Sequence, residues 1–249
     1  MDNPFSLNGK TILVTGASSG IGQTVAIECS KMGAKVVITG RNKDRLAETY
    51  EQLLGEGHIQ YVADISNPDE INGLVEVCPK LDGISHNAGT SKTVLVKFIT
   101  KEYLDMTLNT NTIGPILLTQ SLIRKKKLNN GGSIVFTSSL SGVFCAHYGE
   151  SMYAASKGGL SGFAKAATID LSAQGIRVNC VNPGIVQPGF IKTCGIITEE
   201  ELKDKLKSFP LGRFGEGTDV AWAHIFLLSD ASKWITGINL PVEGGYTLI

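Results

Sequence analysis

The sequence predicts a single α/β domain in which a doubly wound parallel sheet of about seven strands is covered by helices on both faces. Short β-branched runs alternate with longer segments of helical periodicity along nearly the whole chain. Runs such as Val36-Val37-Ile38 are apolar on both sides, as a strand covered on two faces requires. Because parallel strands joined through a helix form right-handed crossovers, this alternation predicts a doubly wound fold.

The expected strands are short apolar runs at Thr11–Thr15, Lys35–Thr39, His58–Val62, Leu81–His86, Gly132–Thr137, Ile176–Val181 and Ile238–Val242. The expected helices show an apolar period of three to four residues at Gly20–Met32, Asp44–Leu54, Pro68–Val77, Lys101–Lys126, Met152–Ala173 and Thr218–Leu228. A small helix is also expected at Thr198–Ser208, inside a long irregular stretch. An insertion beside the carboxyl end of a strand is typical of a lid, so residues 184–217 are expected to form a substrate loop.

Composition excludes several classes of protein. The 249 residues are 42% hydrophobic and 18% charged, with a formal net charge of zero. Nucleic-acid and membrane-surface proteins usually carry a basic excess, so neither partner is expected. No apolar run approaches membrane-spanning length and no signal peptide is evident, so a cytoplasmic protein is expected. The five cysteines are scattered without a CxxC pair, which predicts reduced thiols and no metal site.

A glycine-rich turn joins the first expected strand to the first expected helix. It reads Thr15-Gly16-Ala17-Ser18-Ser19-Gly20-Ile21-Gly22. Gly16 permits the sharp turn, Gly20 lets the backbone approach a pyrophosphate, and Gly22 lets helix and strand pack closely. The helix N-terminus adds unpaired N–H groups for phosphates. A merely flexible turn is the alternative, but this context favours a Rossmann-like dinucleotide site that includes Ser18, Ser19 and Ile21, within one catalytic domain spanning residues 1–249.

The end of the second expected strand indicates the cofactor. An NAD enzyme places Asp or Glu there to accept hydrogen bonds from the ribose hydroxyls. Here the position holds Gly40, and Arg41 follows it. No carboxylate repels a 2′-phosphate, and a guanidinium is offered to bind it, which favours NADP(H) over NAD(H). A solvated charge beside a helix is the other interpretation of Arg41.

Tyr153 and Lys157 lie one helical turn apart, and Ser139 precedes them by a short loop. A hydride that reaches a carbonyl carbon leaves an alkoxide, whose oxygen must be protonated. A free tyrosine, with a pKa of about 10, is a weak acid–base at neutral pH unless its phenolate is stabilised. We expect the Lys157 ammonium, on the same helix face, to stabilise that phenolate. These residues therefore predict hydride transfer between a nicotinamide and a carbonyl or secondary alcohol.

Together these motifs resemble the short-chain dehydrogenase/reductase family, and the resemblance covers nearly the whole chain. The glycine spacing is Gly-x-x-x-Gly-x-Gly instead of GxGxxG, and Tyr-x-x-x-Lys follows in family order. Further matches are Asn87-Ala88-Gly89 beside the cofactor, Asp64-Ile65 at the adenine, Asn111-Thr112-Ile113-Gly114, Pro183-Gly184 with Val186 on the nicotinamide side, Pro210–Gly215, and Gly244-Gly245.

The resemblance implies roles for these residues. Ser139 would hydrogen-bond the substrate oxygen, Tyr153 would be the acid–base, and Lys157 would also hold the nicotinamide ribose. Asn111 would support a water that relays protons from Lys157 to solvent. One position departs from the family: where a threonine usually bonds the carboxamide, this chain has Pro188, which offers neither hydroxyl nor N–H. How the carboxamide is held is therefore open.

Residues after Ser139 and Pro183 are expected to line the substrate pocket: Leu140, Phe144, Cys145, His147, Tyr148, Gln187, Phe190 and Ile191. Most are apolar or aromatic, which favours a moderately hydrophobic carbonyl compound. Cys145 has no evident partner base, so a small wall residue is favoured over a nucleophile. For His147, a surface position is favoured over a role in binding.

The strongest resemblance within the family is to 3-oxoacyl-carrier-protein reductases, which implies an acyl carrier protein as partner. Arg124-Lys125-Lys126-Lys127 would dock it, although a basic run at a helix C-terminus also complements the dipole. Gln174 stands where carrier-binding relatives often have arginine, so sugar, polyol or steroid dehydrogenases of the same family remain open. The small residues Gly158, Gly159 and Gly162 within one helix indicate close helix approach, and the resemblance implies a homotetramer.

Two other functional classes are weighed against this one. A non-catalytic dinucleotide-sensing scaffold would be expected to lose Ser139, Tyr153 or Lys157, and all three are present. A sugar-nucleotide epimerase or dehydratase would need a longer C-terminal lobe and a different glycine spacing. The sequence does not decide the substrate, its stereochemistry or the direction of reaction.

Overall fold

The computed structural model describes residues 3–186, 204 and 206–249, and the described part contains the expected parallel sheet. Its seven strands lie in the order β3-β2-β1-β4-β5-β6-β7, and every neighbouring pair is parallel. The strands are β1 Thr11–Thr15, β2 Lys35–Gly40, β3 Ile59–Val62, β4 Leu81–His86, β5 Leu128–Thr137, β6 Arg177–Pro183 and β7 Asn239–Val242. The predicted fold class is confirmed, as a Rossmann-like single domain.

The described helices are α1 Gly20–Lys31, α2 Lys43–Glu51, α3 Pro68–Val77, α4 Lys101–Leu108, α5 Gly114–Arg124, α6 Ser151–Leu171 and α9 Gly217–Leu228. Short 3₁₀ turns lie at Val96–Phe98, Ser172–Gln174, Asp230–Ser232 and Tyr246–Leu248. The helix expected at Thr198–Ser208 falls largely outside the described residues. So do Pro188 and three of the expected pocket residues: Gln187, Phe190 and Ile191.

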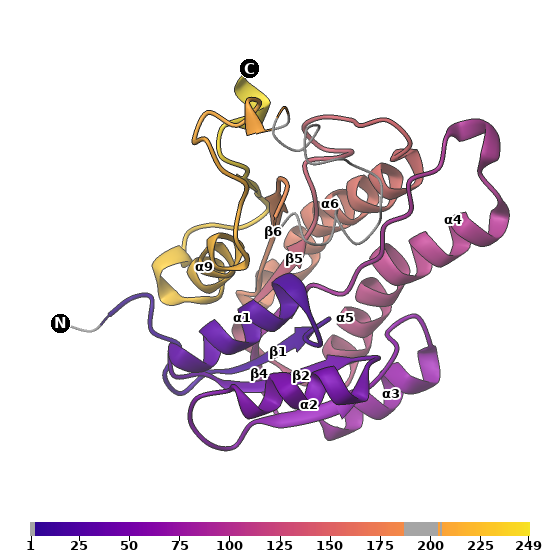
Figure 1. The fold of residues 1–249 in the computed structure, drawn as a ribbon. Coiled ribbons are helices and arrows are strands. Elements are labelled where there is room, and N and C mark those ends of the chain that lie inside the picture. The colour runs from indigo at the N-terminus through magenta and orange to yellow at the C-terminus, as the bar shows by residue number, and fades with distance from the viewer. Residues whose placement is uncertain (1–2, 187–203, 205) are drawn as a thin grey trace.

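Alternating strand residues supply the two cores. Ile12 and Val14 pack with α1 and α9 on one face, and Leu13 packs with α3, α5 and α6 on the other. Figure 1 shows α1 beside α9 on one face of the sheet. Because side chains alternate across a strand, an unbroken apolar run fills both layers at once. Because helices pack on both faces, the sheet holds the ends of its strands, and the polar residues that follow them, in fixed positions.

The helix expected at Lys101–Lys126 is present up to Arg124. It is not regular throughout, because a π-helical turn at Asn109–Ile113 separates α4 from α5. Gly114 lies so close to the Ile65 carbonyl that a Cβ would overlap that oxygen, and Pro115 has no N–H to continue the ladder. Insertions of this kind widen a helix and often occur at functional sites. This one carries Asn111.

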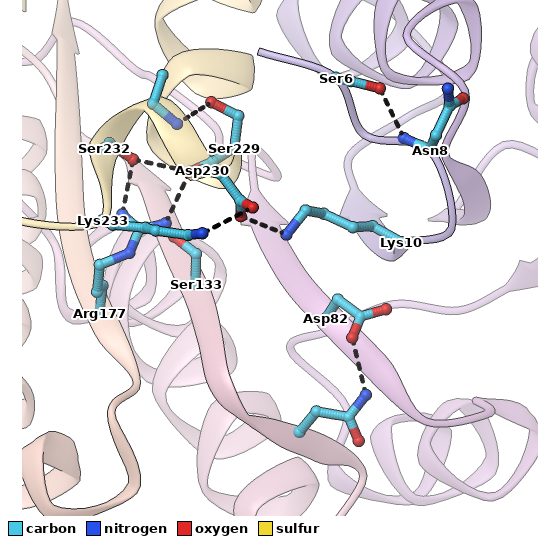
Figure 2. A network of polar contacts seen from close by, with 12 residues as sticks. Ser6, Asn8, Lys10, Asp82, Ser133, Arg177, Ser229, Asp230, Ser232 and Lys233 are labelled. Atoms are coloured by element: carbon cyan, nitrogen blue, oxygen red, sulfur yellow. Dashed lines mark hydrogen bonds and ion pairs between the residues drawn. The ribbon is translucent and has the colours of Figure 1, made fainter. Parts of the chain in front are cut away.

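The amino ends of the strands carry a polar network (Figure 2). Asp230 accepts from Lys10 at 2.9 Å and pairs with Lys233 at 3.0 Å, and these partners hold its pKa below the ordinary value. Arg177, at the start of β6, donates to the Ser232 hydroxyl at 2.8 Å. These contacts tie the segment after α9 to the sheet at the end away from the cleft described next.

Candidate active site

A cleft of about 1320 Å³ opens at the carboxyl ends of the strands. Such ends, where the strand order reverses between β1 and β4, are where doubly wound sheets bind ligands. Most of the predicted cofactor residues line it: Gly16, Ser18, Ser19, Gly20, Ile21, Gly22, Arg41, Asp64, Ile65, Asn87, Ala88, Gly89, Tyr153, Pro183, Gly184 and Val186. The structure therefore brings residues from both halves of the chain to one cleft.

The glycine turn fits a dinucleotide pyrophosphate. A Cβ at Gly16 would lie 2.7 Å from the Ala88 nitrogen, and one at Gly22 would overlap the Gly16 carbonyl. Gly20 has φ +57, and a Cβ there would meet nothing within 4 Å, because it faces the open cleft at the start of α1. The described residues thus leave room for phosphates directly before a helix N-terminus.

At the end of the cleft where the adenosine is expected, the Arg41 guanidinium lies 3.6 Å from Asp64, with 66% of the Arg41 side chain exposed. Burial alone would raise the Asp64 pKa, but hydrogen bonds from Ser66 and the Arg41 charge hold it below its ordinary value. Arg45 also lines the cleft, one turn into α2. Sequence reasoning missed this second guanidinium, although the Arg41-x-x-x-Arg45 spacing was a signal for it.

Ser139, Tyr153 and Lys157 converge at the other end of the cleft. Tyr153 lines it, while Ser139 and Lys157 are buried directly behind its wall. The Ser139 hydroxyl is close enough to the Tyr153 phenol to oppose, by hydrogen bonding, the rise that burial causes in the pKa of that phenol, and Lys157 Nζ lies 5.8 Å from the centre of the phenol ring. Lys157 Nζ donates to the Thr137 carbonyl oxygen at 2.7 Å. A phenol, a hydroxyl and an amine therefore share one corner.

The electrostatics of this corner differ from the expectation that Lys157 makes Tyr153 acidic. Burial raises the pKa of Tyr153 above its ordinary value; the Ser139 hydrogen bond opposes this and the Glu150 charge adds to it. Burial lowers the pKa of Lys157 to about 8. At neutral pH the Tyr153 phenol therefore keeps its proton, as a proton donor must. Lys157 gains and loses its proton within about one pH unit of neutrality.

Asn111 lies in the π-helical turn and is fully buried. Its amide donates to the Thr90 carbonyl at 2.8 Å and to the Ser156 hydroxyl at 3.0 Å, and its oxygen accepts from the Thr90 N–H at 2.7 Å. A Cβ on Gly89 would lie 3.4 Å from the Asn111 oxygen and 3.5 Å from Lys157 Nζ. Gly89 thus leaves a narrow space bordered by both groups.

The described wall near Tyr153 is more polar than the sequence predicted. Of the expected pocket residues that are described, Tyr148 lines the cleft, whereas Leu140 is buried elsewhere. Phe144, Cys145 and His147 are also absent from the described lining. Their places are taken by Ser91, Lys92, Thr93 and Glu150. These come from two loops that meet at the hydrogen bond from Val94 N to Gly149 O, a pairing that no local pattern predicts.

His147 has definite partners. Its Nδ1 lies 2.9 Å from the Ser141 hydroxyl and 3.3 Å from a Glu150 carboxylate oxygen, and its Nε2 lies 3.0 Å from the Tyr246 hydroxyl. His147 therefore ties the loop before α6 to the C-terminal segment. Among the described cysteines, Cys29, Cys78, Cys145 and Cys180 are free thiols.

Comparison with known proteins finds similarity to oxidoreductases over nearly the whole chain. A family model described as enoyl-(acyl carrier protein) reductase matches residues 16–247. A 3-oxoacyl-[acyl-carrier-protein] reductase of Rickettsia felis is 32% identical over 98% of this chain and 100% of that protein. Carbonyl reductase family member 4 of Danio rerio is 34% identical over 95% of this chain and 98% of that protein. A crystal structure assigned as a short-chain alcohol dehydrogenase of Sinorhizobium meliloti 1021 superimposes with a TM-score of 0.91 at 31% identity, covering 99% of each chain.

A Rossmann-like sheet with a glycine turn and a Ser–Tyr–Lys corner defines a nicotinamide-dependent oxidoreductase. The chain belongs to the short-chain dehydrogenase/reductase family, and its pattern is that of the 3-oxoacyl-carrier-protein reductases. It is an enzyme that acts on CH–OH groups with NAD(P). None of the described helices is both long and apolar enough to cross a bilayer.

Proposed function

We propose that this enzyme reduces a carbonyl compound, of the 3-oxoacyl thioester class, with NADPH. The observation that supports this most is the convergence of Ser139, Tyr153 and Lys157 at one end of a cleft whose other end holds the glycine turn. The full-length similarity to 3-oxoacyl-carrier-protein reductases supports the substrate class. It also makes an acyl carrier protein the proposed partner.

When bound, the nicotinamide supplies the hydride for the carbonyl carbon. Tyr153 gives its phenolic proton to the carbonyl oxygen, and the Ser139 hydroxyl orients that oxygen. Lys157, with a pKa near 8, returns a proton to the phenolate. Asn111 and Lys157 border the same narrow space beside Gly89. In this proposal Asn111 holds a water there, through which Lys157 exchanges protons with solvent. Reduction needs a protonated tyrosine, and burial keeps Tyr153 in that form.

The preference for NADP(H) rests on the adenosine end. Gly40 leaves no carboxylate to repel a 2′-phosphate, and Ser18 lies close enough that a Cβ on Gly40 would be 3.0 Å from its hydroxyl. Arg41 and Arg45 offer two guanidinium groups to a dianion. The ion pair between Arg41 and Asp64 is exposed, and such pairs contribute little, so Arg41 is free to turn to a phosphate.

A sugar or polyol substrate is the second candidate, and one observation favours it. The described wall beside Tyr153 carries Ser91, Lys92, Thr93 and Glu150. Such a wall can hydrogen-bond several hydroxyl groups, whereas an alkyl chain would gain little from it. The substrate loop proposed at residues 184–217 lies partly outside the described residues.

Turnover with a substrate panel tests the proposal. We would follow NADPH oxidation with acetoacetyl thioesters, diketones, keto-sugars and ketosteroids. We expect the highest kcat/KM with the thioesters. Highest efficiency with a keto-sugar would replace the substrate class with the second candidate, and no turnover of any carbonyl despite NADPH binding would leave a dinucleotide-sensing scaffold.

We also propose a homotetramer. On α6 an exposed stripe of small and apolar residues runs along one face: Ala155, Gly159, Gly162, Ala166 and Ile169. A Cβ on Gly162 would meet nothing within 4 Å, so this glycine has no close neighbour within the described chain. The glycine at position 158, in contrast, is required by a contact within the chain, because an added Cβ would lie 2.9 Å from the Gly142 carbonyl oxygen. Sedimentation of a strict monomer would contradict the proposal. The free thiols support a reducing, cytoplasmic location.

A further inference from the structure

A closed ring of hydrogen bonds lies under the cofactor cleft, on the α9 face of the sheet. His224, fully buried in α9, has Nδ1 at 2.9 Å from the Ser85 hydroxyl and Nε2 at 3.0 Å from the Thr137 hydroxyl. The Thr137 hydroxyl donates to the Asn87 amide oxygen at 2.7 Å, and the Asn87 amide nitrogen donates to the Ser85 hydroxyl at 2.9 Å. Each side chain thus bonds to two others.

Bond chemistry fixes the direction of every hydrogen in this ring. The Asn87 amide nitrogen also bonds the Ser85 carbonyl oxygen at 3.1 Å, and only a donor can pair with a carbonyl. The amide oxygen must therefore face Thr137, whose hydroxyl donates to it. That hydroxyl then has to accept from His224, so the imidazole proton lies on Nε2 and Nδ1 accepts from Ser85. The ring is satisfied by one neutral tautomer.

Two members of the ring also border the cleft. Asn87 and Thr137 both line it, and the Asn87 and Ala88 N–H groups each bond the Thr15 hydroxyl beside the glycine turn, at 3.1 and 3.3 Å. The Thr137 carbonyl oxygen is the acceptor for Lys157 Nζ at 2.7 Å. The ring therefore connects α9 to the cofactor wall and to Lys157, which comes from the helix on the opposite face of the sheet.

We propose that His224 is a positioning residue that, through Ser85 and Thr137, holds the Asn87 amide against the cofactor and the Thr137 carbonyl against Lys157. This inference rests on the proposed function, because it assigns His224 to the cofactor site of the same enzyme. His224 itself touches no reacting atom. Its effect is to fix two groups that do border the cleft.

His86 is the matched control that the chain offers. It is also a buried histidine and precedes Asn87, but it points to the other face, stacked on Phe136 with ring centres 4.8 Å apart. Its Nε2 lies 2.9 Å from the Thr119 hydroxyl, and its Nδ1 has no partner among the described residues. A leucine at either position removes a buried imidazole, but only the change at His224 opens the ring.

The first experiment compares His224→Leu with His86→Leu by calorimetric titration with NADPH and NADH. We expect His224→Leu to weaken cofactor binding about tenfold, equivalent to roughly 1.4 kcal/mol, and to lower kcat as well. We expect His86→Leu to bind cofactor as the wild type does. Equal binding by wild type and His224→Leu would overturn the inference, and so would equal weakening in both variants. If the wild type itself bound neither dinucleotide, the proposed function would fail instead.

The double variant Ser85→Ala/His224→Leu separates positioning from stability. It removes the Ser85 hydroxyl, whose proton has no acceptor once His224 is replaced, so the thermal midpoint should recover toward the wild type. The affinity for cofactor should not recover, because Asn87 still lacks its support. Recovery of affinity together with stability would show a purely structural role.

A measurement on the wild-type protein covers the case in which the variants fail to fold. Nitrogen NMR of labelled histidine should show His224 with a protonated Nε2 and an unprotonated Nδ1. Addition of NADPH should shift the His224 ring resonances and leave those of His86 unchanged. The opposite tautomer, or a His224 signal that ignores the cofactor, would contradict the inference.

Discussion

Lys157 Nζ lies 5.8 Å from the centre of the Tyr153 ring and is hydrogen-bonded at 2.7 Å to the Thr137 carbonyl. The two side chains are one turn apart on α6, so the sequence predicted that they would be neighbours. Their burial was harder to foresee. It raises the pKa of Tyr153 and lowers that of Lys157, so each group favours its uncharged form.

The first prediction concerns pH. Burial lowers the Lys157 pKa from 10.5 to about 8, so the ammonium persists below that pH and is lost above it. Carbonyl reduction consumes a proton, and alcohol oxidation releases one. We therefore expect kcat for reduction to fall as pH rises through about 8, and kcat for oxidation to rise over the same range. Rate profiles in both directions check this, and a reduction rate that climbs from pH 7 to 9 would contradict it.

Cofactor choice gives the second prediction. Replacing both Arg41 and Arg45 with alanine removes two charged hydrogen-bond donors, each worth roughly 1.5–3 kcal/mol when a phosphate is bound. NADPH binding should weaken by about two orders of magnitude at least, while NADH binding changes little. Calorimetry with both cofactors measures this. Lys233→Ala, at the opposite end of the sheet, is the control, and a wild-type enzyme that prefers NADH would refute the assignment.

Acid stability is the third. Burial lowers the pKa of both His86 and His224 from 6.5 to about 3. Between the two pKa values, at pH 6.5 and about 3, both histidines bind protons in the unfolded chain but not in the folded chain. Their contribution to the free energy of unfolding is therefore fully present above pH 6.5 and falls as the pH is lowered. Each histidine contributes about 1.4 kcal/mol per pH unit over that range. Urea unfolding at pH 7.5, 6.0 and 5.0 measures the slope, and His86→Leu should reduce the histidine share by about half. A slope that His86→Leu leaves unchanged would contradict the prediction.

A fourth prediction concerns the turn. Gly22→Ala places a methyl group against the Gly16 carbonyl, where backbone atoms would have to move. Overpacking of this kind costs about 1–3 kcal/mol. We expect a lower thermal midpoint and weaker binding of both cofactors. Gly131→Ala is a matched change at a glycine whose added Cβ would meet nothing within 4 Å, although its φ of +76 carries a backbone penalty of its own. Cofactor affinity should survive that control, and equal loss in both variants would contradict our account of the turn.

Local patterns were enough to predict the sheet and the glycine turn. β1, β4 and α3 begin and end where the apolar runs do. The residues that line the cleft beside the turn follow from the same logic, because parallel strands present their carboxyl ends together. These features depend on neighbours in sequence, so a single chain is sufficient to find them.

The remaining features depend on contacts between distant segments. In the π-helical turn, the Asn111 amide donates to Thr90 and Ser156. These partners are distant in sequence, so the periodicity of the helix does not predict the turn. The polar wall arises where two loops meet, so the sequence could not predict that Glu150 and Lys92 line the same cleft. In the sequence, His224 lies in an apolar stretch of α9 and resembles an isolated core residue. The role proposed for it depends on Ser85 and Thr137, which lie in β4 and β5 and are distant from it in sequence.

The most direct test of the account is the turnover of Tyr153→Phe with NADPH and an acetoacetyl thioester. The variant loses the proton donor and keeps the ring, so we predict a loss in kcat of roughly 10²–10⁴-fold or more, with NADPH affinity within about twofold of the wild type. A Tyr153→Phe enzyme that reduces the thioester at the wild-type rate would contradict the account.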